Sequence, residues 1–193
     1  MTSEQVFTMD HELKERLFLG GQESPGSWLL QALRLRAAAD RIDDNINPVR
    51  DEEPLVSFMA EYNMLLGLAF ENLLKGYISL VRLEAGLSPA LPKDCHVHKL
   101  ESLANRPECV GLNISAGDLQ SLGRLSPYIE WAGRYPLPKR VGEMIPITSC
   151  SQEHKAELSL WTRLVPLLHE RAWVMKGGPS GMGGVKFHMK RNE

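Results

Sequence analysis

The chain has 193 residues, of which 43% are hydrophobic and 24% are charged, and its net charge is −2. These values are typical of a folded globular protein with one sizeable core, and they exclude a disordered chain and a general attraction to nucleic acid. The three cysteines, Cys95, Cys109 and Cys150, are widely spaced and odd in number, which favours reduced thiols over a disulfide framework.

The sequence shows no pattern of a membrane or secreted protein. No uninterrupted apolar run reaches the length of about 18 residues that a membrane span needs. The amino terminus also lacks a basic segment followed by an apolar one. We therefore expect a cytoplasmic protein without membrane contact.

Dipeptides that contain glycine or proline mark the ends of the helices expected in the first part of the chain. Residues 6–19 are expected to form a weakly amphipathic helix that ends at a Gly-Gly pair. Ser24 then offers an N-cap, and Pro25 suits the first position of a second helix. We expect this helix to run to about Ile46, where an Asn-Pro pair ends it.

A third and longer helix is expected from Pro54 to Ala85. Asp51 is its predicted N-cap, and Gly86 closes it. Its apolar residues recur at helical spacing and predict a stripe that faces the core: Leu55, Phe58, Met59, Tyr62, Leu65, Leu66, Ala69, Leu73, Tyr77 and Leu80.

Glu71 and Lys75 lie on the other side of this third helix, among a second set of apolar residues. A solvated Glu–Lys pair at this spacing contributes only about 0.3–0.5 kcal/mol. In the alternative arrangement the pair lies within a second packed interface, where both charges need partners or a wet cleft. The sequence leaves both arrangements open.

Two further helices are expected in the middle of the chain. A short one spans His98 to Asn105. The next begins at Ser115, because an N-cap serine followed three positions later by Asp118 is a variant of the capping box. Its apolar residues continue to Ala132.

Proline shapes the last part of the chain. Three prolines within residues 135–146 prevent a continuous helix there. Either Ser149 or Ser151 caps a final helix that runs to about Ala172, and Pro166 should kink it.

The pattern as a whole predicts an all-α protein. No strand pattern and no internal repeat is evident, so a helical bundle with mostly antiparallel neighbours is the simplest architecture. Residues 1–176 are expected to form a single domain. Residues 177–193 are rich in glycine and then basic, as in a flexible tail.

Three short motifs in a fixed order resemble the HEPN superfamily of helical domains found in prokaryotes and higher eukaryotes. The motifs are Glu71-Asn-Leu-Leu-Lys75, His98-Lys-Leu-Glu-Ser-Leu103 and Tyr128-Ile-Glu-Trp-Ala-Gly-Arg-Tyr-Pro136. The resemblance covers less than half of the chain. It is to the branch without an obvious nuclease signature, which includes helical partners of minimal nucleotidyltransferases.

The resemblance implies an up-and-down four-helix bundle, here with additional helical segments at both ends, that is frequently dimeric. It implies nucleotide or RNA handling, and no cofactor. The expected function is therefore that of a binding or partner module, with a nucleotidyltransferase as one candidate partner. Fold similarity alone does not establish that function.

The motif residues define a candidate binding site. We expect Glu71, Lys75, His98 and Arg134 to converge, with Tyr135 as a further binding residue, and the His98 ring to bond a carboxylate such as Glu71. Each residue also has a structural alternative. His98 would then orient the short helix that follows it, and Arg134 would satisfy carbonyls in the last turn of its helix instead of binding phosphate.

A metal-independent ribonuclease of toxin or phage-defence type is the alternative function, with an antitoxin as its partner. In HEPN nucleases an Arg and a His four to six residues apart act on the scissile phosphate of RNA. Arg163 and His169 are the one pair with suitable spacing, and Arg134 with His98 is a noncanonical alternative to it. The intervening Pro166 and apolar residues argue against it, because six positions of a regular helix separate two side chains by about 120°. A structural dimerisation protein is the third alternative.

Two other clusters carry less information. Cys95, His96 and His98 offer soft ligands, but a closed zinc site needs four and no matching pair follows, so no metal is expected. Arg34, Arg36 and Arg41 are diluted by nearby aspartates, which predicts a solvated helix face.

Overall fold

A computed structural model describes residues 24–46, 59–135, 141 and 151–172. These residues are mostly helical and contain no strand, which confirms the all-α class. The elements are α2 (Pro25–Ile46), α3 (Met59–Glu84), η1 (Lys93–Cys95), α4 (Leu100–Ala104), η2 (Pro107–Leu112), α5 (Ala116–Pro127), η3 (Tyr128–Ala132) and α6 (Ser151–Ala172).

Several sequence predictions fall on residues outside these ranges. They are the helix over residues 6–19, the cap at Asp51 with the start of the long helix at Pro54, the prolines after Tyr135, the cap at Ser149, the thiol of Cys150 and the tail over residues 177–193.

Helix α2 has the predicted bounds. The Ser24 carbonyl accepts the first hydrogen bonds of the helix, from the amides of Ser27 and Trp28, and Pro25 occupies the first helical position. The prediction of a solvated arginine face is wrong for Arg36, whose exposed fraction is 8%. Arg36 lies on the helical stripe of the buried Leu29, Ala32 and Ala39. Its guanidinium Nη2 lies 2.6 Å from Oδ1 of Asp40, one turn further along the helix.

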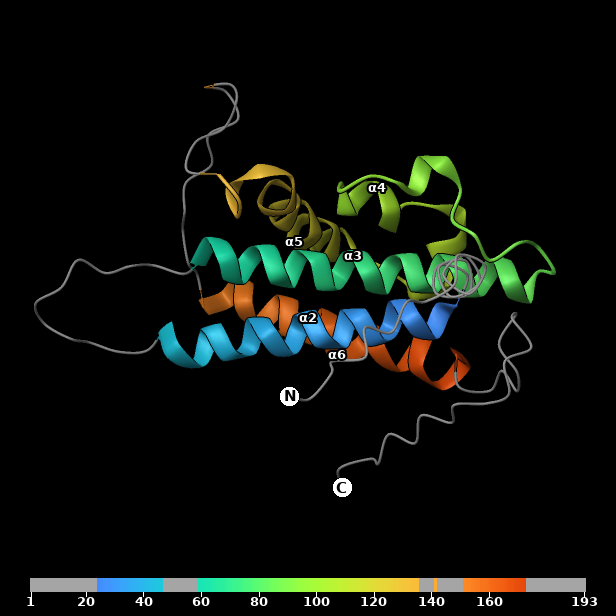
Figure 1. Cartoon of the computed structure of the whole chain (residues 1–193), viewed down its shortest axis with the longest axis horizontal. Helices are drawn as coiled ribbons and strands as arrows, with labels where there is room; N and C mark the ends of the chain where they lie inside the picture. Colours follow the sequence, from blue (N-terminus) through green and yellow to red (C-terminus); the bar gives the residue numbers. More distant parts are fainter. Residues whose placement is uncertain (1–23, 47–58, 136–140, 142–150, 173–193) are drawn as a thin grey trace, which may run out of the picture.

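Helix α3 is the centre of the described structure. Figure 1 shows α2 and α6 on one side of it and α4 and α5 on the other. Both of its faces are therefore covered, and fifteen of its 26 residues are buried. By length and composition α3 could cross a bilayer, yet 72% of its most apolar window lies buried inside the protein, as in a core helix.

Contacts near the two ends of α3 give the directions of the long helices beside it. Gly76 of α3 packs against Trp28 near the start of α2 and Leu168 near the end of α6. The Tyr62 hydroxyl, near the start of α3, and His154 Nδ1, near the start of α6, share a hydrogen bond of 2.8 Å. Hence α2 runs antiparallel to α3 and α6 runs parallel to it (Figure 1).

The end of α6 is fixed to the end of α3. The Arg171 guanidinium lies 5.2 Å from the centre of the Tyr77 ring and donates to its hydroxyl at 3.0 Å. Arg171 also donates two hydrogen bonds to the Glu84 carboxylate. Halfway along the pair, Phe70 and Trp161 meet edge to face. Helix α6 continues through Pro166 to Ala172.

Helix α5 starts as predicted, with a complete capping box. The Ser115 hydroxyl accepts from the Asp118 amide, and the Asp118 carboxylate accepts from the Ser115 amide. The α-helix ends at Pro127, because proline has no backbone N–H to donate to the carbonyl four residues earlier. The chain widens into the π-helix η3, in which the Gly133 amide donates to the Tyr128 carbonyl.

We predict that Gly76→Leu destabilises the protein by about 2 kcal/mol or more, measured by denaturant unfolding. Even a Cβ atom at Gly76 would lie 2.9 Å from both Leu168 and Trp28. The control is Gly117→Ala in the first turn of α5, where the nearest atom is 3.8 Å away and alanine should be neutral or stabilising. Equal stability of the two variants would contradict the close packing of α2, α3 and α6.

Candidate functional site

Glu71, Lys75 and His98 meet at one polar cluster. The Lys75 ammonium donates to Glu71 Oε1 at 2.5 Å, and His98 Nδ1 lies 2.8 Å from Glu71 Oε2. Because a carboxylate accepts and does not donate, Nδ1 carries the hydrogen of that bond. The structure thus brings these three residues together and gives His98 a carboxylate partner, while their role in binding a ligand stays a prediction.

The cluster lies in a packed interface and reaches solvent only through His98. Glu71 and Lys75 are exposed by 5% and 7%, whereas 49% of the His98 side chain is exposed. The second packed face of the long helix is therefore present, and the solvated arrangement of the Glu71–Lys75 pair is wrong. A buried pair of this kind is stable only if both charges keep their partners.

The short helix α4 holds His98 in place through contacts with α5. His98 precedes Leu100, which is fully buried. The Leu100 amide donates to the Ser126 hydroxyl at 3.0 Å, and that hydroxyl donates to Glu101 at 2.6 Å. Ser126 of α5 thus accepts a hydrogen bond from the first turn of α4, as an N-cap side chain would. Sequence analysis did not identify it, because it lies 26 positions from the amide that it binds.

The cysteines beside the cluster are not suited to nucleophilic chemistry. Cys95 is completely buried, and burial raises its pKa against the opposing effect of the Arg106 charge. Burial raises the pKa of Cys109 to about 12. Both thiols are free, as expected. Within the described ranges, no group of three or more His, Cys, Asp or Glu side chains could hold a metal ion.

A surface charge network braces the loops next to the cluster. Arg106 forms paired bonds of 3.2 Å with Glu108 and one of 2.5 Å with Asp94, which ties η2 to η1. Arg82 of α3 lies 3.9 Å from Glu108. The hydrogen bond from Arg106 lowers the pKa of Asp94. These contacts fix the segment from which His98 projects.

Arg134 lies at the end of η3 and has the structural role foreseen for it. Its Nη2 donates to the Glu130 carbonyl, in the last turn of its helix. Its guanidinium carbon lies 5.7 Å from the centre of the Tyr135 ring. Arg134 is exposed, and 56% of Tyr135 is exposed. None of the contacts described for Arg134 reaches Glu71, Lys75 or His98, so its place in a shared site with them stays a prediction.

Arg163 joins α6 to the start of α5. It donates to Asp118 at 2.5 Å and to the Asn113 carbonyl at 3.0 Å. Burial opposes the ionisation of Asp118, but bonds from Ser115 and Arg163 lower its pKa below the usual value. Arg163 therefore reinforces the capping box. His169 is partly buried two turns further along α6, and no described contact joins it to Arg163.

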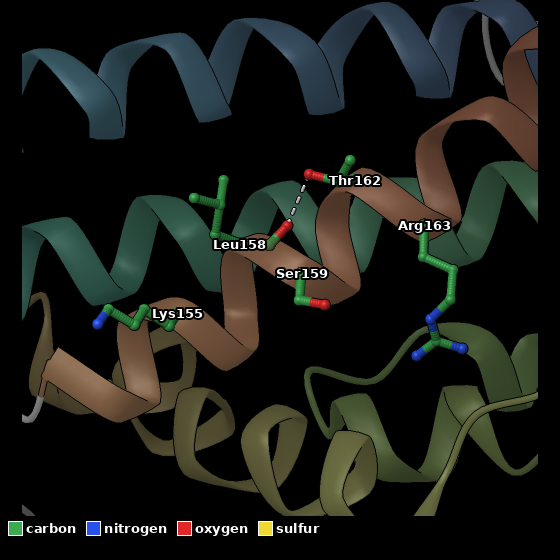
Figure 2. Close-up of a pocket in the computed structure, with 5 residues that line it drawn as sticks. All are labelled: Lys155, Leu158, Ser159, Thr162 and Arg163. Atoms are coloured by element: carbon green, nitrogen blue, oxygen red, sulfur yellow. Dashed lines mark hydrogen bonds between the residues drawn. The ribbon is translucent and has the colours of Figure 1, made fainter.

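A shallow groove runs along the outer surface of α6 (Figure 2). Its volume is about 400 Å³, and it is lined by Lys155, Leu158, Ser159, Thr162 and Arg163. Figure 2 shows the Arg163 side chain pointing away from Leu158 and Thr162, toward the loop before α5. The Thr162 hydroxyl bonds to the Leu158 carbonyl of its own helix at 2.8 Å. The groove is thus the uncovered face of α6.

Buried polar side chains also lie between α3, α5 and α6, and sequence analysis did not identify them. Arg124 of α5 pairs with Glu157 of α6, whose exposed fraction is 1%. Asn63 of α3 is equally buried, and among the described residues neither polar atom of its side-chain amide has a hydrogen-bond partner. An unsatisfied buried amide costs stability. Helical periodicity gives no signal for such residues, because their neighbours are far away in the sequence.

Comparison of the chain with protein families, with characterised proteins and with solved structures found no match.

We predict that Glu71→Ala lowers the free energy of unfolding by at least about 2 kcal/mol, because it leaves the Lys75 ammonium buried without its carboxylate. Replacing both charges, as Glu71→Leu with Lys75→Met, should restore much of that loss. The control is Glu170→Ala, an exposed glutamate of α6, which should change stability by less than about 0.5 kcal/mol. If denaturant melts give the same small effect for Glu71→Ala, the pair is solvated in solution.

Proposed function

We propose that the chain is a HEPN-like four-helix bundle that binds a nucleotide or RNA, as a binding or partner module, without cutting it. The observation that carries the proposal is the meeting of Glu71, Lys75 and His98, which come from two separate motifs of the resemblance. The start of α5 contacts α6 through Asp118 and Arg163, and its end does so through Arg124 and Glu157, so α5 runs antiparallel to α6. Taken in chain order, α2, α3, α5 and α6 therefore alternate in direction, which is compatible with an up-and-down bundle.

The Arg134–Tyr135 pair supports a nucleic-acid ligand. One guanidinium nitrogen of Arg134 is occupied by the Glu130 carbonyl, and the group keeps further donors for a phosphate. The exposed Tyr135 ring beside it offers a surface on which a base can stack. Arginine and an aromatic ring side by side are what single-stranded nucleic acid needs, a cation for the backbone and a flat face for the base.

The contacts of Arg163 favour binding over cleavage. A catalytic arginine must present its guanidinium to the scissile phosphate. In this chain Asp118 and the Asn113 carbonyl already occupy the Arg163 group, and Pro166 lies between it and His169. The ribonuclease is therefore the second candidate, and its residues remain Arg163 and His169.

We predict that Arg134→Ala weakens the binding of a short single-stranded RNA by roughly tenfold, a loss of about 1.4 kcal/mol, measured by fluorescence anisotropy at fixed salt. The control is Arg34→Ala, an exposed arginine of α2 whose loss removes the same net charge. Total RNA incubated with the wild-type protein in a chelator should stay intact.

Two outcomes would contradict this function. Equal affinities of the Arg34→Ala and Arg134→Ala variants would remove Arg134 from the binding site. Chelator-resistant cleavage that disappears in both Arg163→Ala and His169→Ala, with unchanged helicity, would establish the ribonuclease, because two residues that act on one transition state fail individually and to a similar extent.

A further inference from the structure

His98 is the one member of the polar cluster that can meet a ligand. About half of its side chain is exposed, whereas Glu71 and Lys75 are buried. Its Nδ1 atom is committed to Glu71, and within the described part of the chain that bond is its sole polar contact. The other ring nitrogen, Nε2, is therefore the atom that remains for an external partner.

The buried carboxylate fixes the direction of the ring. Glu71 cannot turn toward solvent without leaving Lys75, which holds its other oxygen at 2.5 Å. The carboxylate accepts from Nδ1 whether or not Nε2 also carries a hydrogen. Lys75 is bonded to the other oxygen of the same carboxylate.

The carboxylates on the elements around His98 have hydrogen-bond partners of their own. Asp94 and Glu108 are both bonded to Arg106. Cys95 is a buried neutral thiol whose pKa burial raises. Glu101 is engaged by the Ser126 hydroxyl. The exposed Lys99 is a permanent cation next to His98 in the chain. The charge at this surface thus changes with the protonation of His98.

We propose that His98 contacts a phosphate group of the bound RNA or nucleotide through Nε2 as an imidazolium, so that binding takes up one proton. This inference rests on the proposed function and adds a residue contact and a proton linkage to it. His98 is the ligand-contacting residue, and Glu71 is a positioning residue that acts through the ring. Binding tightens as the pH falls, because only the protonated ring can donate from Nε2 while Nδ1 donates to Glu71.

The test uses the full chain and a short oligouridylate with hydroxyl ends, whose phosphodiesters keep the same charge across the working range. The affinity is measured by fluorescence anisotropy between about pH 5 and pH 8, at constant ionic strength. For the wild type, the dissociation constant rises with pH, by at most about tenfold per pH unit for one linked proton. Calorimetry in two buffers of different ionisation enthalpy counts the protons taken up.

Two variants and one control locate the proton. His98→Gln binds more weakly at low pH and loses the pH dependence. Glu71→Gln, where it remains folded by circular dichroism, moves the pH dependence to lower pH, because an amide stabilises the imidazolium less than a carboxylate does. The control His96→Gln changes an exposed histidine of the same segment and leaves the wild-type profile unchanged.

The possible results distinguish the proton linkage at His98 from RNA binding itself. RNA binding by the wild type that is independent of pH, or that keeps its pH dependence in His98→Gln, would overturn the inference and leave the binding function standing. No RNA binding by the wild type at any pH would overturn the proposed function, and this inference with it.

Discussion

The buried carboxylate of Glu71 is the constraint on which the described structure depends most. It is the shared partner of a buried ammonium on its own helix and of a half-exposed imidazole on another segment. A carboxylate removed from water must be matched by donors, and here the donors come from two elements. The segment that carries His98 is therefore attached to α3 by polar contacts as well as by the burial of Leu100.

The burial of α3 on both faces gives that carboxylate its environment. Helices α2 and α6 cover one side, and α4 and α5 cover the other (Figure 1). The helices approach closely at Gly76 on the first side and at Gly67 on the second, where a Cβ atom would lie 2.7 Å from Ile129. The site is consequently a half-exposed histidine bonded to a buried ion pair.

Local signals in the sequence were sufficient for much of the fold. The Ser24-Pro25 start of α2 and the capping box at Ser115 were predicted because each rests on neighbouring residues and fixed spacing. The bond between His98 and Glu71 was foreseen from the order of the motifs. By contrast, the Ser126 support for α4, the Arg163–Asp118 contact and the burial of Arg36 depend on how helices pack. Periodicity within one helix cannot specify which residue of another helix it will meet.

A double-mutant cycle between Glu71 and His98 tests the central claim most directly. The four proteins are the wild type, Glu71→Gln, His98→Gln and the double variant, and the quantity is the coupling in the free energy of unfolding at pH 7. A carboxylate shared between α3 and the His98 segment predicts a coupling of about 1 kcal/mol or more. Single effects that add within about 0.3 kcal/mol would contradict it, because the two residues would then be independent in solution.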